Sequence, residues 1–216
     1  LSGALHGLFR VRCFTQDDAH IFMTKEQMET EIQNVVKLFD EVYSVFGLKY
    51  TIELSTMPED HIGTVEEWEF NQNILKSAIT AMGKDFVINE GDGAFYGPKL
   101  DFHIEDCLGR TWQCGTIQLD SQLPERFHLE YVGEDGLKHR PVMIHRVVFG
   151  SIERFIGVIT EHFAGAFPLW LSPVQVKVLP VTERAHEYAA QVAAKLEEAG
   201  VRVESDLRSE KLGYKI

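Results

Sequence analysis

The sequence predicts an α+β fold, in which an antiparallel sheet is flanked by helices, followed by a second and smaller α/β domain. Three observations support this prediction. Several short segments alternate apolar with polar residues and are joined by short turns, which is typical of antiparallel strands. Segments with apolar residues at helical spacing lie between and after them. Close to the C-terminal end the order changes to strand, helix and strand, which predicts a parallel βαβ unit.

The N-terminal part of the chain carries clear boundary signals. Residues 8–14 alternate apolar residues with arginines and predict a half-buried strand, and 19–23 predict another after the polar run TQDD. Thr24, with Gln27 three residues later, forms a capping box at the start of a helix that Gly47 ends. The apolar stripe of this helix comprises Met28, Ile32, Val35, Phe39, Val42 and Phe46.

The middle of the chain continues the mixed pattern. Residues 51–55 predict a strand, and Thr64 with Glu67 opens a second helix that runs to about Met82. Strands follow over 99–107 and 111–120, joined by the turn LGR, and a further strand is expected over 127–133. The stretch 141–151 leads into a helix over 151–163.

A change in composition marks a domain boundary. Residues 166–173, AFPLWLSP, contain two prolines, so we place one domain over 1–168 and the next over 169–216. The chain has no initiator Met and stops without a closing element, which indicates an internal piece of a longer protein.

Composition limits the classes of function. The 216 residues are 44% hydrophobic, and a net charge of −12 argues against indiscriminate nucleic-acid binding while leaving room for a local basic patch. No apolar run approaches the roughly 20 residues of a membrane span. The three cysteines form no C-x-x-C pair, which favours a reducing, cytoplasmic compartment over a disulfide framework or zinc knuckle.

Two histidines are candidate metal ligands. His20 and His145 are each expected at a strand end beside a charged residue, and neutral imidazole is a good ligand for Zn²⁺. Two histidines without local ligand spacing are more often a satisfied core or surface pair, so that alternative stays open. Cys114 is either a third ligand or a buried, inert thiol on its predicted strand.

Three other groups of residues point to a polar ligand. The segment 90–99, EGDGAFYGPK, is not a phosphate-binding P-loop, so its glycines either bring the backbone close to a ligand or form an ordinary loop, with Tyr96 able to face a pocket. The strand QCGTIQLD has polar residues on one face, which either line a wet pocket or face solvent. The arginines are suited to an anionic ligand, although each alone fits an ion pair; they are Arg10, Arg12, Arg146 and Arg154.

Several of these motifs together resemble a known family. RVRCFTQDDAHIF resembles motif 2 of class II aminoacyl-tRNA synthetases in their threonyl form, and GSIERFIGVITEHFAGAFPLWLSPVQV resembles motif 3 running into an anticodon-binding domain. GAFYGPKLDF, QCGTIQLD and PVMIHR stand between them in the expected order. The resemblance covers the whole chain, as a fragment that starts within motif 2 and ends inside the anticodon-binding domain. It implies a six- or seven-stranded antiparallel sheet, a cytoplasmic homodimer, and a ligase that acts on threonine, Mg²⁺–ATP and threonine tRNA.

The resemblance also implies roles for individual residues. His20 and His145 match two zinc ligands, and the third, a Cys, is expected upstream of Leu1. Two arginines match catalytic positions: Arg10 at the ATP phosphates, and Arg154, which sandwiches adenine with Phe14. Gln113 matches a further position near ATP. The positions around threonine are matched by Gln16, Asp18, Tyr96, Gln118 and Ser151.

Some family features are not in this sequence. The first motif-2 arginine is expected before Leu1, and Cys13 and Met23 stand where Gly and Cys are more usual. The fragment alone is therefore expected to be inactive, as one half of a true synthetase. A synthetase-like regulatory or RNA-binding module is the other alternative, which the presence of His20, His145 and Arg154 disfavours.

Overall fold

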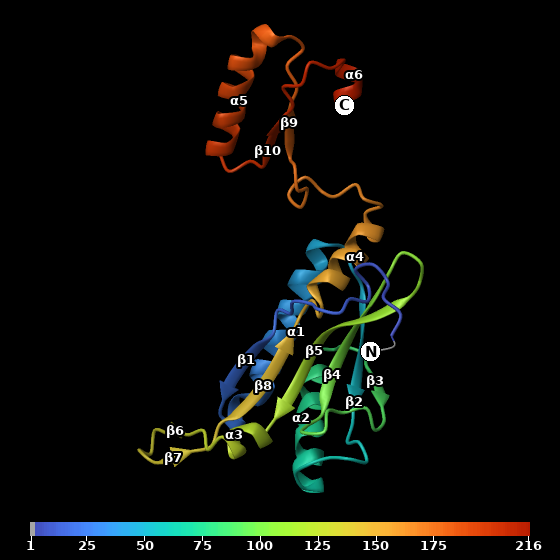
Figure 1. Ribbon diagram of the computed structural model, residues 1–216. Coiled ribbons are helices and arrows are strands. Elements are labelled where there is room, and N and C mark those ends of the chain that lie inside the picture. Colours follow the sequence, from blue (N-terminus) through green and yellow to red (C-terminus); the bar gives the residue numbers. More distant parts are fainter. Residues whose placement is uncertain (1–2) are drawn as a thin grey trace. The chain divides into compact units, whose positions relative to one another are not determined.

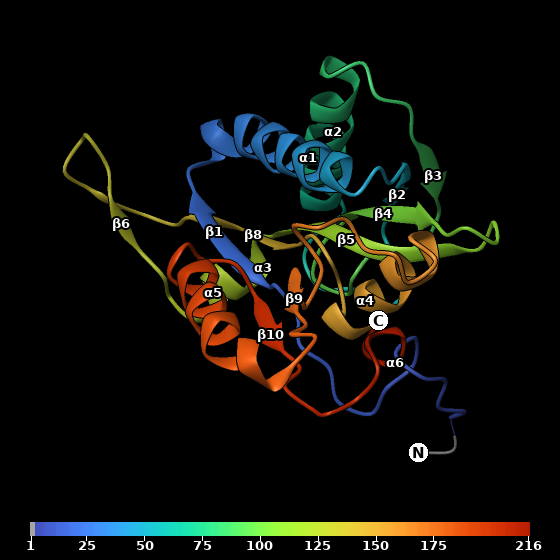
Figure 2. The same ribbon diagram turned by 90° about the horizontal axis from the view of Figure 1, so that it is seen from above.

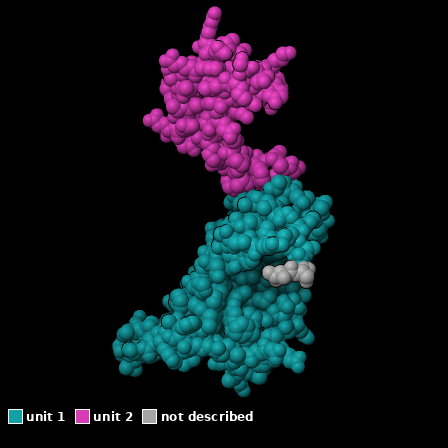
Figure 3. Space-filling view, in the orientation of Figure 1, with its two compact units in different colours: residues 1–162 teal, residues 163–216 magenta. Residues whose placement is uncertain are grey.

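The computed structural model describes residues 3–216, which form two compact units (Figure 3). Among the described residues, unit 1 extends to His162 and unit 2 is residues 163–216. The division falls between His162 and Phe163, a few residues before the position that the prolines of 166–173 indicate.

A six-stranded sheet forms the centre of unit 1 (Figure 1). Its spatial order is β1-β8-β5-β4-β2-β3, and neighbouring strands run antiparallel except for the parallel pair β2 and β3. The strands are β1 (Ala19–Met23), β2 (Tyr50–Ser55), β3 (Val87–Asn89), β4 (Lys99–Glu105), β5 (Thr111–Asp120) and β8 (Val142–Val147). With its flanking helices, this sheet confirms the α+β prediction.

Two helices cover one face of the sheet (Figure 2). They are α1 (Met28–Val45), which follows the short 3₁₀ turn η1 (Lys25–Gln27), and α2 (Val65–Ala81). Below them, Leu100, Phe102 and Ile104 of β4 are fully buried. Because successive strand residues face opposite sides, the polar residues between them face away from the helices. The candidate site belongs to that second face, on the side where α4 lies (Figure 2).

Both predicted capping boxes are present and confirm the helix starts. The Thr24 amide donates to Gln27 Oε1 (2.9 Å), and the Glu67 amide donates to Thr64 Oγ1 (3.2 Å). The predicted stripe of α1 is buried at four positions but only half-buried at Val42 and Phe46. Tyr43 is buried in their place, with its hydroxyl donating to the Val148 carbonyl (2.5 Å).

Two expected strands are wrong. Residues 8–14 form turns: the amides of Phe9 and Arg10 donate to the His6 carbonyl, and the Phe9 ring packs on Trp112 (4.9 Å between centroids) instead of on a sheet. Residues 127–133 contain only the two-residue strand β6 (Tyr131–Val132), which pairs with β7 (Lys138–His139) in a small hairpin. Alternation is a weak signal where the main sheet offers no neighbouring strand edge.

The remaining elements of unit 1 are two helices. Helix α3 (Gln122–Arg126) is short, and its start is capped by Asp120, whose Oδ1 accepts from the amides of Gln122 and Leu123 (2.8 and 2.9 Å). Helix α4 (Ile152–His162) starts at Ser151, whose Oγ accepts from the Arg154 amide (3.2 Å). Both helices therefore begin beside residues of the candidate site.

Unit 2 contains the predicted parallel βαβ arrangement. Strands β9 (Val176–Val178) and β10 (Val203–Ser205) are parallel neighbours and are connected by η2 (Glu183–Ala185) and α5 (His186–Glu198). The short helix α6 (Leu212–Lys215) follows. Across residues 3–216, none of the helices has both the length and the apolar character that a membrane crossing requires.

Candidate functional site

The two histidines that the sequence singles out lie side by side. His20 on β1 is directly opposite His145 on β8 in the strand register, and their ring centroids are 4.6 Å apart. The pair is also joined to β5, because His145 is opposite Gln118 in the next strand. Antiparallel pairing therefore brings together two imidazoles from distant parts of the sequence, as the hypothesis of a shared site requires.

A carboxylate that the sequence analysis did not single out contacts His145. His145 Nε2 lies 2.8 Å from Oδ2 of Asp120, a fully buried residue at the end of β5. A carboxylate only accepts hydrogen bonds, so Nε2 donates in this contact and Nδ1 takes no part in it. No spacing rule reveals this contact, since it depends on the register of β5 against β8.

Tyr96 and Gln118 extend this group. The Tyr96 hydroxyl donates to Gln118 Oε1, and its ring centroid is 5.4 Å from that of His145. Burial raises the pKa of the Tyr96 phenol to about 12, and the carboxylates of Asp120 and Asp18 act in the same direction. Tyr96 therefore stays a neutral hydrogen-bond donor at physiological pH.

The glycines beside Tyr96 approach backbone, not a free ligand space. A Cβ on Gly97 would lie 1.9 Å from the Leu119 carbonyl oxygen, and one on Gly93 would lie 2.5 Å from the Thr56 carbonyl oxygen. Both glycines therefore allow the loop to pack against neighbouring strands. That packing fixes the place of Tyr96 over β5.

A cavity of about 300 Å³ is lined by other predicted site residues, and none of His145, Tyr96 and Gln118 is in its lining. It is lined by the four residues expected around ATP and by two of those expected around threonine. They are Arg10, Phe14, Gln113 and Arg154 in the first set, and Gln16 and Ser151 in the second. Gln16 and Ser151, both of the threonine set, are bridged backbone to backbone, and the two predicted sets meet because one cavity is lined by residues of both.

Arg154 is held from two sides in this cavity. Its Nε donates to the Phe9 carbonyl (3.1 Å), and its guanidinium carbon lies 5.4 Å from the centroid of a Trp112 ring. Phe9 and Trp112 also contribute to the site without having been predicted. An alternating strand pattern does not distinguish a residue that supports an arginine from one that fills a core.

Cys114 lines the same cavity but does not have the properties of a metal ligand. It is buried, and burial raises the pKa of its thiol to about 12. The neutral thiol favours the alternative of an inert residue, because metals bind the thiolate. Within residues 3–216, no group of three or more His, Cys, Asp or Glu side chains is arranged to hold a metal.

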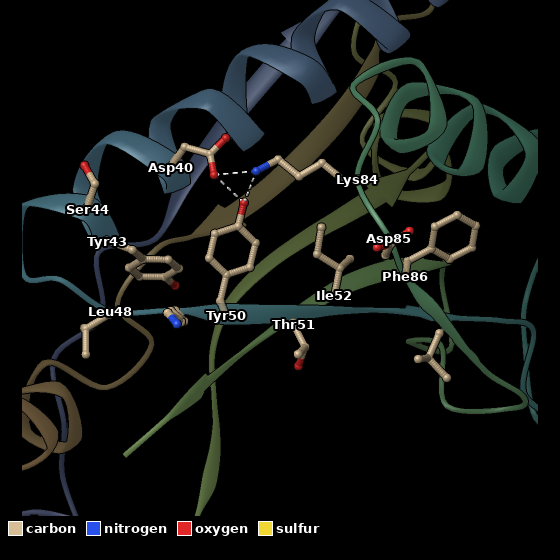
Figure 4. Close-up of a pocket in the computed structure, with 12 residues that line it drawn as sticks. Asp40, Tyr43, Ser44, Leu48, Tyr50, Thr51, Ile52, Lys84, Asp85 and Phe86 are labelled. Carbon is tan, nitrogen blue, oxygen red and sulfur yellow. Dashed lines mark hydrogen bonds and ion pairs between the residues drawn. The ribbon is translucent and has the colours of Figure 1, made fainter. Parts of the chain in front are cut away.

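A larger cavity, of about 620 Å³, contains none of the predicted site residues (Figure 4). At its rim Lys84 donates to Asp40 (2.5 Å) and to the hydroxyl of Tyr50 (2.8 Å), which itself donates to Asp40 (2.6 Å). Burial opposes the charge of Lys84, but these hydrogen bonds raise its pKa. The three groups satisfy one another, so size alone does not make this cavity the functional site.

The remaining predicted positions lie on the segments that border the site. Asp18 immediately precedes β1, close enough to Tyr96 to influence its pKa. Arg146 pairs with Asp17 (3.2 Å), and Arg12 is exposed. The arginines therefore divide: Arg10 and Arg154 line the cavity, while Arg146 serves as an ion-pair partner.

Comparisons with known proteins identify the family. The family described as tRNA synthetase class II core domain (G, H, P, S and T) matches residues 2–163, and the anticodon binding domain matches 175–216. A threonine–tRNA ligase of Acetivibrio thermocellus is 69% identical over the whole chain, which spans about a third (34%) of that relative's length.

Two solved structures agree with this family. The RNA binding domain of threonyl-tRNA synthetase from Cryptosporidium parvum Iowa II is 47% identical, with a TM-score of 0.94 over 100% of this chain and 54% of that one. A putative threonyl-tRNA synthetase of Aeropyrum pernix is 35% identical, with a TM-score of 0.78 over 95% and 50%. The chain thus belongs to the class II aminoacyl-tRNA synthetases, with threonine–tRNA ligases among its relatives, as the resemblance predicts.

Proposed function

We propose that the protein containing this chain is a threonine–tRNA ligase. It activates threonine with Mg²⁺–ATP to threonyl-adenylate and transfers the threonyl group to the 3′ end of threonine tRNA. The observation that carries the proposal is that one cavity is lined by residues of both predicted sets, with Arg10 and Arg154 of the ATP set beside Gln16 and Ser151 of the threonine set. Adenylate formation needs the threonine carboxylate beside the α-phosphate of ATP, and a site that holds both substrates together supplies this proximity.

The nucleotide side of the site works through charge and stacking. Arg10 and Arg154 supply positive charge in the cavity, which would stabilise the charge that develops on the phosphates during attack. Phe14 and Arg154 would hold adenine between them. Arg154 is already held by its contacts with Phe9 and Trp112, so little reorganisation is needed when ATP binds.

The threonine side selects for a hydroxyl group. Asp18 would accept the hydrogen bond of the substrate hydroxyl, while Tyr96 and Gln118 form a polar wall beside it. Valine has nearly the same shape but leaves Asp18 without a partner, which costs several kcal/mol when a charged group is covered by a ligand that cannot pair with it. Serine keeps the hydroxyl, so this side of the site distinguishes it only weakly from threonine.

The residues present fit two ligands of a zinc site. His20 and His145 lie together, and the Asp120 contact leaves Nδ1 of His145 available, an arrangement that is common for metal-binding histidines. When bound, zinc would supply a Lewis acid that interacts with the amino and hydroxyl groups of threonine. A third protein ligand, the Cys that the resemblance places upstream of Leu1, would complete the site.

Other properties of the ligase rest on the resemblance. Unit 2 would bind the anticodon of the tRNA, in agreement with the matching family. The homodimer and the cytoplasmic location stay predictions. We also propose that this chain alone does not form adenylate, because the first motif-2 arginine and the third zinc ligand are not among its residues.

Threonine-dependent exchange of pyrophosphate into ATP tests the proposed function. The full-length protein should catalyse exchange with threonine, weakly with serine and not with valine. His20→Ala should remove exchange activity and lower the zinc content measured by atomic absorption, while His186→Ala on α5 serves as a control that changes neither. Exchange with valine equal to that with threonine, or full zinc and activity in His20→Ala, would refute the assignment.

A further inference from the structure

Two segments that carry predicted site residues are joined along their backbones. Residues 15–18 precede β1, and residues 148–154 run from the end of β8 into the first turn of α4. The Ile152 amide donates to the Thr15 carbonyl (2.9 Å), and Gln16 forms a bridge with Ser151. The first segment carries Gln16 and Asp18 of the threonine side, and the second carries Arg154 of the nucleotide side, so their relative position sets the distance between threonine and nucleotide.

Asp17 supplies most of the side-chain contacts at this junction. Its carboxylate accepts from the amides of Val148 (2.8 Å) and Phe149 (2.9 Å) and from Nη1 of Arg146 (3.2 Å). The same Arg146 nitrogen donates to the Asp17 carbonyl (3.1 Å). The Asp17 side chain is 20% exposed and does not line the cavity, so its acceptors are used by the protein and not by a substrate.

Glu153 makes a second, more exposed contact across the same junction. Its two carboxylate oxygens accept from the Thr15 amide (3.1 and 3.0 Å), and one of them also accepts from Ser151 Oγ (3.1 Å). Hydrogen bonds to its own backbone amide and to that of Thr15 lower the pKa of Glu153, which keeps it an acceptor. The junction is thus fixed at both ends by carboxylates bound to backbone amides.

We propose that Asp17 is a positioning residue for adenylate formation. It holds the segment with Gln16 and Asp18 at a fixed distance from the segment with Ser151 and Arg154. Hydrogen bonds from N–H groups to an ionised acceptor are short and about twice as strong as neutral ones, which suits them to fixing two loops. The inference rests on the proposed function, in which small displacements of one substrate relative to the other cost much of the rate.

The geometry indicates that Asn cannot make the same contacts as Asp at this position. The two Asp17 oxygens accept separately, one from the Phe149 amide and the other from the Val148 amide and Arg146. Asn has only one acceptor oxygen, and its NH₂ group would face an N–H or guanidinium donor. Asp17→Asn therefore breaks one side of the junction while preserving the shape of the side chain.

The test uses the full-length protein with Asp17→Asn and Asp17→Glu. Asp135→Asn is the matched control, because Asp135 also accepts from a backbone amide, that of Leu137 (2.9 Å), but in the β6–β7 hairpin. Pyrophosphate exchange is measured per active site, counted by the burst of adenylate. We expect kcat/KM for threonine and for ATP to fall at least tenfold in Asp17→Asn, with normal values in the control.

Hydrogen exchange gives a readout that does not need activity. The amides of Val148 and Phe149 should exchange at least tenfold faster in Asp17→Asn, because their acceptor is weakened. Asp17→Glu keeps the charge and both acceptors but is longer by one methylene group. We expect Asp17→Glu to fold with near-normal thermal stability. Its kcat per site should fall, because the longer side chain displaces the two segments relative to each other.

The outcomes separate this inference from the proposed function. Normal kcat and KM per active site in both Asp17 variants, with only the thermal midpoint lowered, would show a purely structural role and overturn the inference. If Asp17→Asn does not fold, the kinetics of Asp17→Glu decide the question. Absence of threonine-dependent exchange in the wild type would instead refute the proposed function, and unchanged protection of Val148 and Phe149 would refute the contact itself.

Discussion

At the residue scale, Gly97 determines the position of the neighbouring Tyr96, although it has no side chain of its own. Its backbone passes so close to Leu119 that an added Cβ would lie 1.9 Å from the carbonyl oxygen. This close approach places the neighbouring Tyr96 where its hydroxyl meets Gln118 and its ring meets His145. A glycine in a loop is commonly interpreted as a source of flexibility, but here it permits tight packing.

We expect Gly97→Ala to destabilise unit 1 by about 1–3 kcal/mol, the usual range when atoms are forced into a packed region. Urea unfolding of this chain, followed by circular dichroism, measures the change. Gly213→Ala is the control, because a Cβ there meets no atom within 4 Å. Equal midpoints for the two variants would show that the loop yields without cost.

At the scale of elements, the turn between β4 and β5 is organised by one carboxylate. Asp106 accepts from the amides of Leu108 and Arg110 (both 2.9 Å), from Arg110 Nε (2.6 Å) and from Trp112 Nε1 (2.8 Å). Arg110 also reaches Glu161 on α4 (2.8 Å). The turn therefore joins the hairpin to α4 and supports Trp112, on which Arg154 rests.

The stability that Asp106 provides should depend on pH. Burial acts to raise its pKa, but the hydrogen bonds from Trp112 and Arg110 outweigh burial and lower the pKa to about 2 from an ordinary 3.8. A lowered pKa in the folded state means that the contribution is complete above pH 4 and is lost as the pH falls towards 2.

Asp106→Asn should therefore lower the free energy of unfolding by about 1–3 kcal/mol at pH 7, as for other hydrogen bonds to charged groups. Urea midpoints at pH 7, 4 and 2.5 should show the gap between variant and wild type closing as the pH falls. Asp60→Asn, at an exposed position, should leave the midpoint unchanged at every pH. A gap that stays constant over this range would contradict the assignment.

At the scale of the whole molecule, the chain consists of two units whose internal contacts are largely separate. The segment that follows α4 contains exposed small residues at Ala164, Gly165 and Ala166, and the first two have positive φ angles of 49° and 76°. Exposed backbone outside helices and strands is the preferred site of proteolysis. The connection between the units is thus an exposed segment that a protease can reach.

Limited digestion with elastase, which cuts after small residues, should cleave first within residues 164–166. Mass spectrometry should then detect a fragment that contains all of unit 1. The alanines of α5 provide an internal control, since their backbone is protected by helical hydrogen bonds. First cleavage inside α5 or inside the sheet of unit 1 would contradict the division into two units.

Most of the fold was predictable because its signals are local. The capping boxes at Thr24 and Thr64, the alternation of 111–120 and the βαβ order of unit 2 all depend on residues close in sequence, and each is confirmed. The strand expected over 8–14 is wrong, because Phe9 packs against Trp112 and its segment turns back at His6. The alternation of apolar and polar residues indicates which side chains will be buried, but it does not indicate which part of the fold will cover them.

The sequence by itself determined the family, the order of the elements and the residue types available for chemistry, since motifs and periodicity are properties of the chain. Only the tertiary structure decided that His20 lies opposite His145, that Asp120 contacts that histidine, and that Asp17 accepts from Val148 and Phe149. These contacts join residues far apart along the chain, and strand register sets which of them meet. Register is fixed by packing of the whole sheet, so no local pattern contains it.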